Sequence, residues 1–218
     1  RMSDTPDPVL QRVRAGLHWP SWQHWQDAVA DELPTIDLGP VDHHSRDVAI
    51  RSRLSLAKTT DHGGPYLDIF TTQAHERIER EFGQELGPLA SFTFAIKDLL
   101  AVEGRPMMAG SAARQDAPQE QATAPMIRLL EALGAVSIGT VTLHEFAFGV
   151  TGINPFAGTA MNPTAPDRIT GGSSSGSAAA VADGSARISI GTDTGGSIRG
   201  PASLDRKSTR LNSSHLVI

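Results

Sequence analysis

The chain has 218 residues, a formal net charge of −5 and no cysteine. Its hydrophobic content of 39% and charged content of 20% are ordinary for a globular protein, and no stretch approaches the length of a membrane span. Without a basic cluster, the charge pattern argues against nucleic acid or a membrane surface as a partner. The lack of cysteine excludes disulfides, thiolate catalysis and cysteine metal sites, and it is compatible with the cytoplasm, where we expect the protein.

Residues 1–85 are predicted to form an N-terminal helical segment. Apolar residues at helical spacing predict helices over residues 7–19 and 21–33. Helix-forming composition predicts two further helices over residues 42–60 and 72–82.

The pattern changes to that of an α/β protein further along the chain. Residues 89–96 (LASFTFAI) are apolar and predict a buried strand. An amphipathic helix over residues 118–133, with Gly134 as its C-cap, is followed by a second buried strand over residues 135–141. This alternation predicts a mixed sheet flanked by helices.

Residues 143–148 predict a short helix, and residues 151–170 form a long polar loop of a length that usually serves a function. The following stretch, residues 171–203, contains two clusters of glycine and serine. A flexible linker would have such a composition, but the alanine-rich residues 178–182 favour a helix and residues 187–190 alternate like a strand. We therefore interpret the stretch as backbone shaped around chemistry.

Two common motifs fit the first cluster incompletely. A phosphate-binding loop needs a lysine where Ser177 stands. A nucleophile elbow centred on Ser174 needs a preceding strand and a later histidine, and the only later histidine is His215 near the end of the chain. We expect Ser174, Ser175 and Ser177 to act as helix-cap and packing residues.

A serine nucleophile without histidine needs another proton acceptor, either a carboxylate or a lysine. Lys97 directly continues the predicted buried strand, where desolvation lowers the pKa of an amine. The alternative for Lys97 is a strand-end lysine that reaches water. Lys58 lies in a polar helix and Lys207 in the C-terminal tail, so neither is a candidate.

Three separated motifs carry a resemblance to a known family. They are FAIKDL at residues 94–99, GGSSSGSAAAVA at residues 171–182 and GTDTGGSIRGPAS at residues 191–203. Together they resemble the amidase signature family over roughly residues 86–203, with 24 positions between the two key serines. The resemblance implies the amidase signature fold, Ser197 as the acylated nucleophile, Ser173 as a bridging serine after a cis peptide bond, and Lys97 as the base.

The second cluster offers support for such a reaction. Backbone N–H groups of Thr194, Gly195 and Gly196 are expected to form an oxyanion hole, where glycine permits close approach. We expect Asp193 and Arg199 to support this loop structurally through hydrogen bonds.

The predicted function is hydrolysis of a carboxamide through an acyl-serine, without a metal or organic cofactor and with a small-molecule amide as the partner. Two alternatives stay open, the A subunit of a glutamyl-tRNA amidotransferase and a truncated, non-catalytic fragment. Three tryptophans within residues 19–25 favour the free-standing amidase. Neither the amide nor the oligomeric state follows from the sequence.

The chain is expected to hold only part of the fold. Residues 86–204 form an incomplete amidase signature core, so we expect little turnover from these 218 residues alone. Residues 205–218 are polar and aperiodic and resemble a translated sequencing adapter, which predicts a non-native read-through tail. Arg1 precedes Met2, so either Met2 is the natural start or the beginning is missing.

Overall fold

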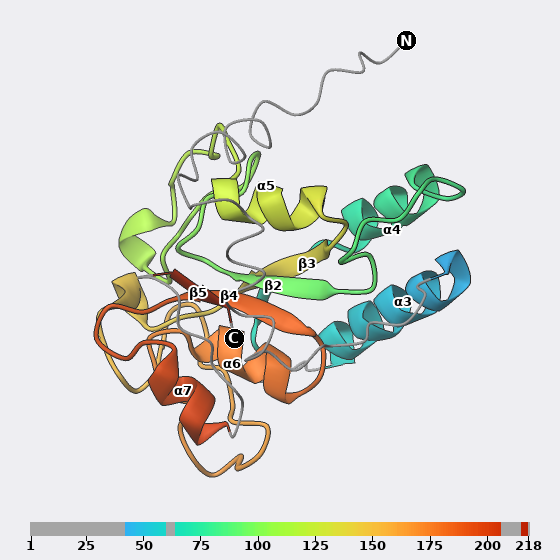
Figure 1. The fold of residues 1–218 in the computed structure, drawn as a ribbon. Helices are drawn as coiled ribbons and strands as arrows, with labels where there is room; N and C mark the ends of the chain where they lie inside the picture. The colour runs from blue at the N-terminus through green and yellow to red at the C-terminus, as the bar shows by residue number, and fades with distance from the viewer. Residues whose placement is uncertain (1–41, 60–63, 206–214, 218) are drawn as a thin grey trace, which may run out of the picture. The chain divides into compact units, whose positions relative to one another are not determined.

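The computed structural model describes residues 42–59, 64–205 and 215–217. Within this part of the chain, five strands form one sheet in the order β1-β3-β2-β4-β5 (Figure 1). Strand β2 is parallel to both β3 and β4, whereas β1 and β5 pair antiparallel at the two edges. The strands are β1 (Tyr66–Ile69), β2 (Thr93–Lys97), β3 (Val136–Val141), β4 (Ile188–Thr192) and β5 (His215–Val217).

Helices flank both faces of the sheet, with α5 on one face and α6 on the other (Figure 1). The predicted α/β class with a mixed sheet is therefore confirmed. The described helices are α3 (His43–Thr59), α4 (Thr71–Arg80), α5 (Pro125–Ala132), α6 (Ser175–Ala182) and α7 (Arg199–Leu204), with short 3-10 turns η1 (Ala112–Arg114) and η2 (Glu145–Ala147). None of the described helices combines the length and the apolar content that a membrane span requires.

Strand β2 is buried along its whole length and connects the two halves of the core. Its side chains alternate between the sheet faces, as they do in any strand. Phe94 and Ile96 belong to the core cluster on the α5 face, whereas Ala95 belongs to the cluster that includes Ala180 of α6. This alternation places Lys97, two residues after Ala95, on the α6 face of the sheet.

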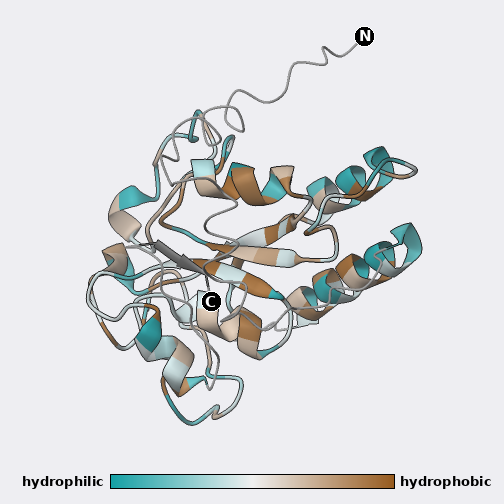
Figure 2. Cartoon of the chain, viewed as in Figure 1, coloured by the Kyte–Doolittle hydropathy of each residue, from teal (hydrophilic) through white to brown (hydrophobic). Residues whose placement is uncertain are grey.

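Helix α3 is amphipathic and packs on the same core through one stripe. Its buried residues are Arg46, Ile50, Leu54 and Ala57, at the spacing of one helix face. Figure 2 shows hydrophilic and hydrophobic patches alternating along this helix. Helix α3 contributes apolar side chains to the core that β2 and β3 share, and it belongs to the compact unit that begins at His43.

The predicted helix over residues 118–133 is wrong in its first half. The helix begins only at Pro125, and Ala124 before it is extended, with φ −54° and ψ 139°. A residue that precedes proline is excluded from the helical region by contact with the proline ring. Gly134, with φ +99°, ends the helix as predicted.

Other boundaries also differ from the sequence-based expectations. The strand predicted over residues 89–96 begins at Thr93, because the preceding residues form a turn closed by Phe92 N–H and Leu89 C=O at 2.9 Å. The helix predicted over residues 143–148 is a single 3-10 turn, in which Phe146 takes a left-handed conformation with φ 50°. Strand β1 and helix α7 were not predicted, and both are too short to show a clear periodicity.

The helices predicted over residues 7–19 and 21–33 lie outside the described residues. Within the predicted read-through tail, residues 215–217 form β5, which pairs antiparallel with β4. The backbone of these three residues thus extends the sheet at its β4 edge.

Candidate active site

Lys97 ends β2 and its side chain is completely buried. Its Nζ atom donates to three hydroxyl groups, Ser173 Oγ at 2.8 Å, Ser174 Oγ at 3.0 Å and Thr192 Oγ1 at 2.8 Å. These three acceptors use all the donors that a lysine ammonium has. A buried lysine with only neutral partners is an unusual arrangement, because desolvation of the charge is not repaid by an ion pair.

Burial lowers the pKa of Lys97 from its ordinary value of 10.5 to about 7, and the Asp193 carboxylate opposes this shift. Burial outweighs the Asp193 carboxylate because the side chain is completely buried and, among the described residues, no carboxylate hydrogen-bonds to the amine. Near pH 7 a large fraction of the amine is therefore neutral and has a lone pair that accepts a proton.

The first partner, Ser173, lies in a segment whose backbone is fixed on both sides. The Gly172–Ser173 peptide bond is cis, at the position that the family resemblance implies. Ser173 C=O accepts from His144 N–H at 3.0 Å, and Gly172 N–H donates to Val150 C=O at 2.8 Å. A Cβ atom on Gly172 would lie 2.7 Å from the backbone nitrogen of Gly152, so only glycine fits at this position.

Ser174 and Thr192 were not anticipated as partners of the lysine. Ser174 stands at the N-cap of α6, but its hydroxyl makes no cap hydrogen bond. Instead it donates to Thr192 C=O at 3.2 Å and accepts from Thr192 N–H at 3.3 Å. The prediction of a helix-capping role for Ser174 is therefore wrong, because its hydroxyl links α6 to the end of β4 and to Lys97. The predicted packing role suits Ser177, whose hydroxyl donates to Ile190 C=O at 3.3 Å.

The hydrogen bonds of Ser174 also restrict where the lone pair of a neutral Lys97 points. The Ser174 proton is used by Thr192 C=O, so Ser174 only accepts from the amine. Ser173 and Thr192 remain as hydroxyls that donate to the lone pair. Ser173 is thus in a position to pass its proton to the amine.

The strand pairing explains why Thr192 contacts Lys97. Parallel pairing of β2 with β4 places Ile96 opposite Ile190, so the carboxyl ends of the two strands lie side by side. Lys97 and Thr192 follow these paired residues. Recognition of that contact required knowledge that β4 neighbours β2, which no local motif supplies.

The loop after β4 is wrapped around the carboxylate of Asp193. Its Oδ1 accepts from Gly196 N–H at 2.7 Å, and its Oδ2 accepts from Ile198 N–H at 3.1 Å and Arg199 N–H at 3.2 Å. The Arg199 guanidinium adds two further hydrogen bonds of 3.0 Å, one to each oxygen. These bonds, first of all those from the Arg199 side chain, hold the pKa of Asp193 well below its usual range. The carboxylate thereby fixes the conformation of the loop.

Ser197 lies in this loop and is partly exposed. Its C=O accepts from Ser174 N–H at 3.0 Å, which attaches the loop to the segment that contains the Lys97 partners. Of the expected oxyanion donors, Gly196 N–H already donates to the Asp193 carboxylate. The N–H groups of Thr194 and Gly195 make no hydrogen bond to any described residue. A Cβ atom on Gly195 would meet nothing within 4 Å, so its side of the loop is open.

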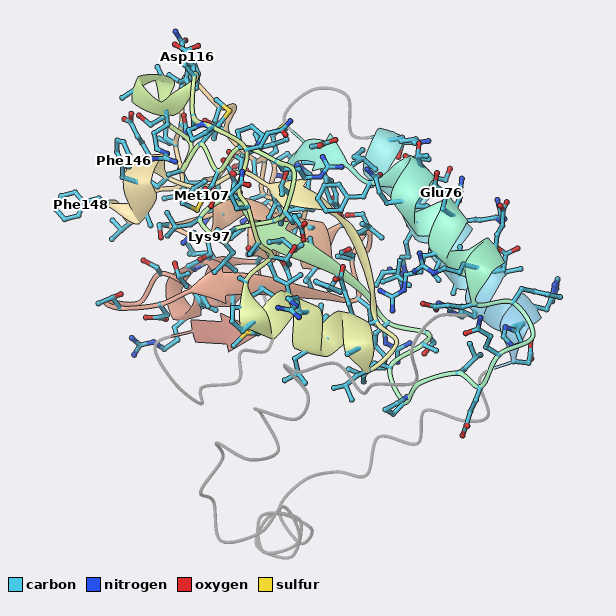
Figure 3. All side chains as sticks on the ribbon, turned by 90° about the horizontal axis from the view of Figure 1, so that it is seen from above. Glu76, Lys97, Met107, Asp116, Phe146 and Phe148 are labelled. Carbon is cyan, nitrogen blue, oxygen red and sulfur yellow. The ribbon has the colours of Figure 1, made fainter. Side chains whose placement is uncertain are left out.

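The backbone after His144, whose N–H donates to Ser173 C=O, carries exposed apolar side chains. Phe146 is 50% exposed and Phe148 is 90% exposed. Phe146 and Ala147 both have left-handed backbone conformations, with φ of 50° and 56°, which are uncommon for residues other than glycine. Figure 3 shows Lys97 inside the fold and the ring of Phe148 projecting from its margin. The backbone after β3 therefore presents two apolar side chains at the surface of the described residues.

Comparison with known proteins identifies the class of protein to which this fold and site belong. The family model described as Amidase matches residues 68–206. The chain is 44% identical over 147 residues to the 1-carboxybiuret hydrolase subunit AtzE of Pseudomonas sp. (strain ADP), which covers 63% of the chain and 32% of that protein. It is 50% identical over 115 residues to the indoleacetamide hydrolase of Pseudomonas savastanoi, which covers 53% of the chain and 25% of that protein.

A solved structure shows the same fold. The peptide amidase from Stenotrophomonas maltophilia superposes with a TM-score of 0.65 at 30% identity, over 84% of this chain and 37% of that one. The chain belongs to the amidase family, and it spans a quarter to a third of the length of the two curated relatives named above.

Proposed function

We propose that this chain carries the nucleophile and the base of an amide hydrolase, with Ser197 as the nucleophile, Ser173 as a proton relay and Lys97 as the base. One observation supports the proposal most strongly: a completely buried lysine donates all its hydrogen bonds to hydroxyls, one of which follows a cis peptide bond. Burial lowers the pKa of this lysine to about 7, which suits a general base at neutral pH.

In the first half-reaction, neutral Lys97 accepts the proton of Ser173 while Ser173 accepts the proton of Ser197. Ser197 Oγ forms a bond to the amide carbonyl carbon, and the carbonyl π electrons move to its oxygen. The Lys97 ammonium then returns a proton through Ser173 to the amide nitrogen. The C–N bond breaks, ammonia or an amine leaves, and the acyl group stays on Ser197.

In the second half-reaction, water takes the place of Ser197 as the proton donor to the same relay. The oxygen of water attacks the acyl carbon, the Ser197 ester bond breaks, and the proton returns to Ser197 Oγ. A carboxylic acid is released and Lys97 is neutral again.

The developing oxyanion requires hydrogen-bond donors that are free and aimed at an open space. We assign this role to the N–H groups of Thr194 and Gly195. Gly196 was also expected to be an oxyanion donor, but its N–H donates to the Asp193 carboxylate and so stabilises the loop. Loss of one oxyanion donor typically lowers the rate by about 10²–10³-fold.

The substrate is proposed to be a carboxamide. Amidotransferase A subunits are also among the relatives, and the same relay would serve glutamine hydrolysis in such a complex. The two functions differ in one measurable way. A free-standing amidase releases ammonia from simple amides without partner subunits, whereas an amidotransferase subunit needs partners and glutamine.

The test uses the full-length protein that contains this sequence, because the chain covers only part of its relatives. A fluorophosphonate probe is expected to label Ser197, and ammonia release from simple carboxamides is expected in the same preparation. Ser197→Ala should abolish both signals, and Lys97→Ala should abolish turnover. Ser203→Ala, at an exposed serine of α7, is the matched control and should change neither.

Labelling that survives Ser197→Ala would disprove the assignment of the nucleophile. Unchanged turnover in Lys97→Ala would remove the base from the mechanism. We also propose that the 218 residues alone have little turnover, and efficient hydrolysis by this fragment would contradict that expectation.

A further inference from the structure

Two buried asparagines, each followed by a proline, form similar turns in the long loop after β3. Asn154 is 2% exposed and Asn162 is 1% exposed. In both, Oδ1 accepts from the N–H groups two and three residues further along the chain, at 2.9–3.1 Å. The backbone hydrogen bonds of the two turns are alike, but Asn162 Oδ1 also accepts from Thr164 Oγ1 at 2.8 Å, and the two amide nitrogens have different partners.

The Asn154 amide nitrogen ties two separate loops together. Its Nδ2 donates to Gly110 C=O at 2.8 Å and to Leu143 C=O at 2.9 Å. A Cβ atom on Gly110 would lie 2.5 Å from this nitrogen, so the contact is tightly packed. Every donor and acceptor of the Asn154 side chain is therefore in use.

Both loops lead directly to the proposed base and relay. Leu143 precedes His144, whose N–H donates to Ser173 C=O at 3.0 Å. Gly110 belongs to the turn whose Met108 N–H donates to Asp98 Oδ1 at 3.3 Å, next to Lys97. Asn154 thus joins the backbone beside the lysine to the backbone beside the serine.

The Asn162 amide nitrogen reaches neither loop. Its Nδ2 donates to Ile169 C=O, at the far end of the long loop, and to Leu204 C=O, at the end of α7, both at 3.4 Å. The two asparagines share burial and a neighbouring proline, but only Asn154 hydrogen-bonds to the Gly110 turn on the Lys97 side, whereas Asn162 binds Ile169, four residues before Ser173. The chain therefore offers a matched pair for an experiment.

We propose that Asn154 is a positioning residue that holds Lys97 and Ser173 in contact and keeps water away from the amine. Its importance for catalysis rests on the proposed function, whereas the contact between Lys97 and Ser173 that it maintains can be measured without catalysis. Loss of the Asn154 amide frees the Gly110 turn from the backbone that holds Ser173. Water then reaches the Lys97 amine in place of the 2.8 Å contact with Ser173.

The expected consequence is a change in the proton affinity of Lys97. The charged groups near it are Asp193, whose carboxylate favours the ammonium, and Asp98, which follows it in the chain. The elements packed against it, β3, β4 and α6, contain no charged residue. In this proposal Asn154 therefore acts on the desolvation of the Lys97 amine, and hydration of this amine raises the pKa of Lys97 toward its ordinary value.

The test is an NMR titration of lysine 13Cε in the full-length resting protein, without substrate. The Lys97 resonance is assigned by its loss in Lys97→Arg. In Asn154→Ala the midpoint of Lys97 is expected to rise by about one pH unit or more, which corresponds to about 1.4 kcal/mol between the two protonation states.

Asn162→Ala is the control and should leave the Lys97 midpoint in place, even if it lowers the melting temperature. Asn154→Ser, which keeps one donor and one acceptor on a shorter side chain, provides a milder second variant if Asn154→Ala does not fold. It should produce a smaller rise. An unchanged midpoint in folded Asn154 variants, or an equal rise in Asn162→Ala, would overturn the proposal.

Labelling of Ser197 by the fluorophosphonate in the same proteins separates the two proposals. If Asn154 acts as a positioning residue, the pH at which the labelling rate is half-maximal should follow the Lys97 midpoint in each variant. A shifted Lys97 midpoint without any labelling of Ser197 would disprove the proposed function and leave the role of Asn154 intact.

Discussion

The buried lysine makes the stability of the fold depend on pH in a defined window. The unfolded chain keeps a proton on Lys97 up to pH 10.5, whereas the folded protein releases it above about 7. Between these values the unfolded state binds more protons, so the free energy of unfolding rises with pH. The full difference corresponds to about 5 kcal/mol, of which about 2 kcal/mol appears between pH 7 and 9.

Other shifted groups do not interfere in this window. Burial raises the pKa of Asp98 to about 6, so this carboxyl has titrated before pH 7. Burial also raises the pKa of Tyr66, so its phenol stays protonated in both states up to pH 9. The Lys97 shift therefore spans the window from pH 7 to 9, and comparison with a variant that lacks this amine isolates its contribution.

Urea unfolding at half-unit steps from pH 7 to 9 measures this slope. Lys97→Met removes the titrating group and should flatten the profile, whereas Lys58→Met, at an exposed lysine, should retain the wild-type slope. The reasoning would be refuted by a flat wild-type profile, or by a Lys97→Met profile as steep as that of the wild type.

Three further substitutions test the packing and the loop. Glu81→Gln should lower the free energy of unfolding by about 3 kcal/mol, because it leaves the buried Arg46 guanidinium without its carboxylate partner. The control Asp47→Asn, in an exposed ion pair with Arg51, should change the free energy of unfolding by less than about 0.5 kcal/mol. Gly176→Ala should destabilise by about 2 kcal/mol in urea, because the new Cβ would lie 2.6 Å from a backbone oxygen just after β3. Gly195→Ala keeps the backbone N–H, and its Cβ would meet nothing within 4 Å, so the melting temperature should not change. The added methyl group should lower kcat for amide hydrolysis because it occupies the open side where we place the oxyanion; an unchanged kcat would place the oxyanion elsewhere.

Local sequence determined the parts of the molecule that depend on neighbouring residues. The helix-forming composition of α3 and α4, the buried run of β2 and the glycine that ends α5 are properties of short segments, and each appeared near its predicted place. The choice of Lys97, Ser173 and Ser197 also came from short motifs. The helix predicted before Pro125 failed for a local reason as well, since the restriction on Ala124 outweighed the amphipathic pattern.

Tertiary structure decided which groups meet at the site. Pairing of β2 with β4, which joins residues 94 positions apart, brings Thr192 to the lysine and leaves Ser174 between them. The fold of the loop around Asp193 decided that Gly196 holds a carboxylate and left Gly195 open. The physical reason is that a motif specifies backbone freedom and side-chain chemistry over a few residues. Hydrogen-bond partners, and the burial that lowers the pKa of Lys97, arise only when distant segments pack together.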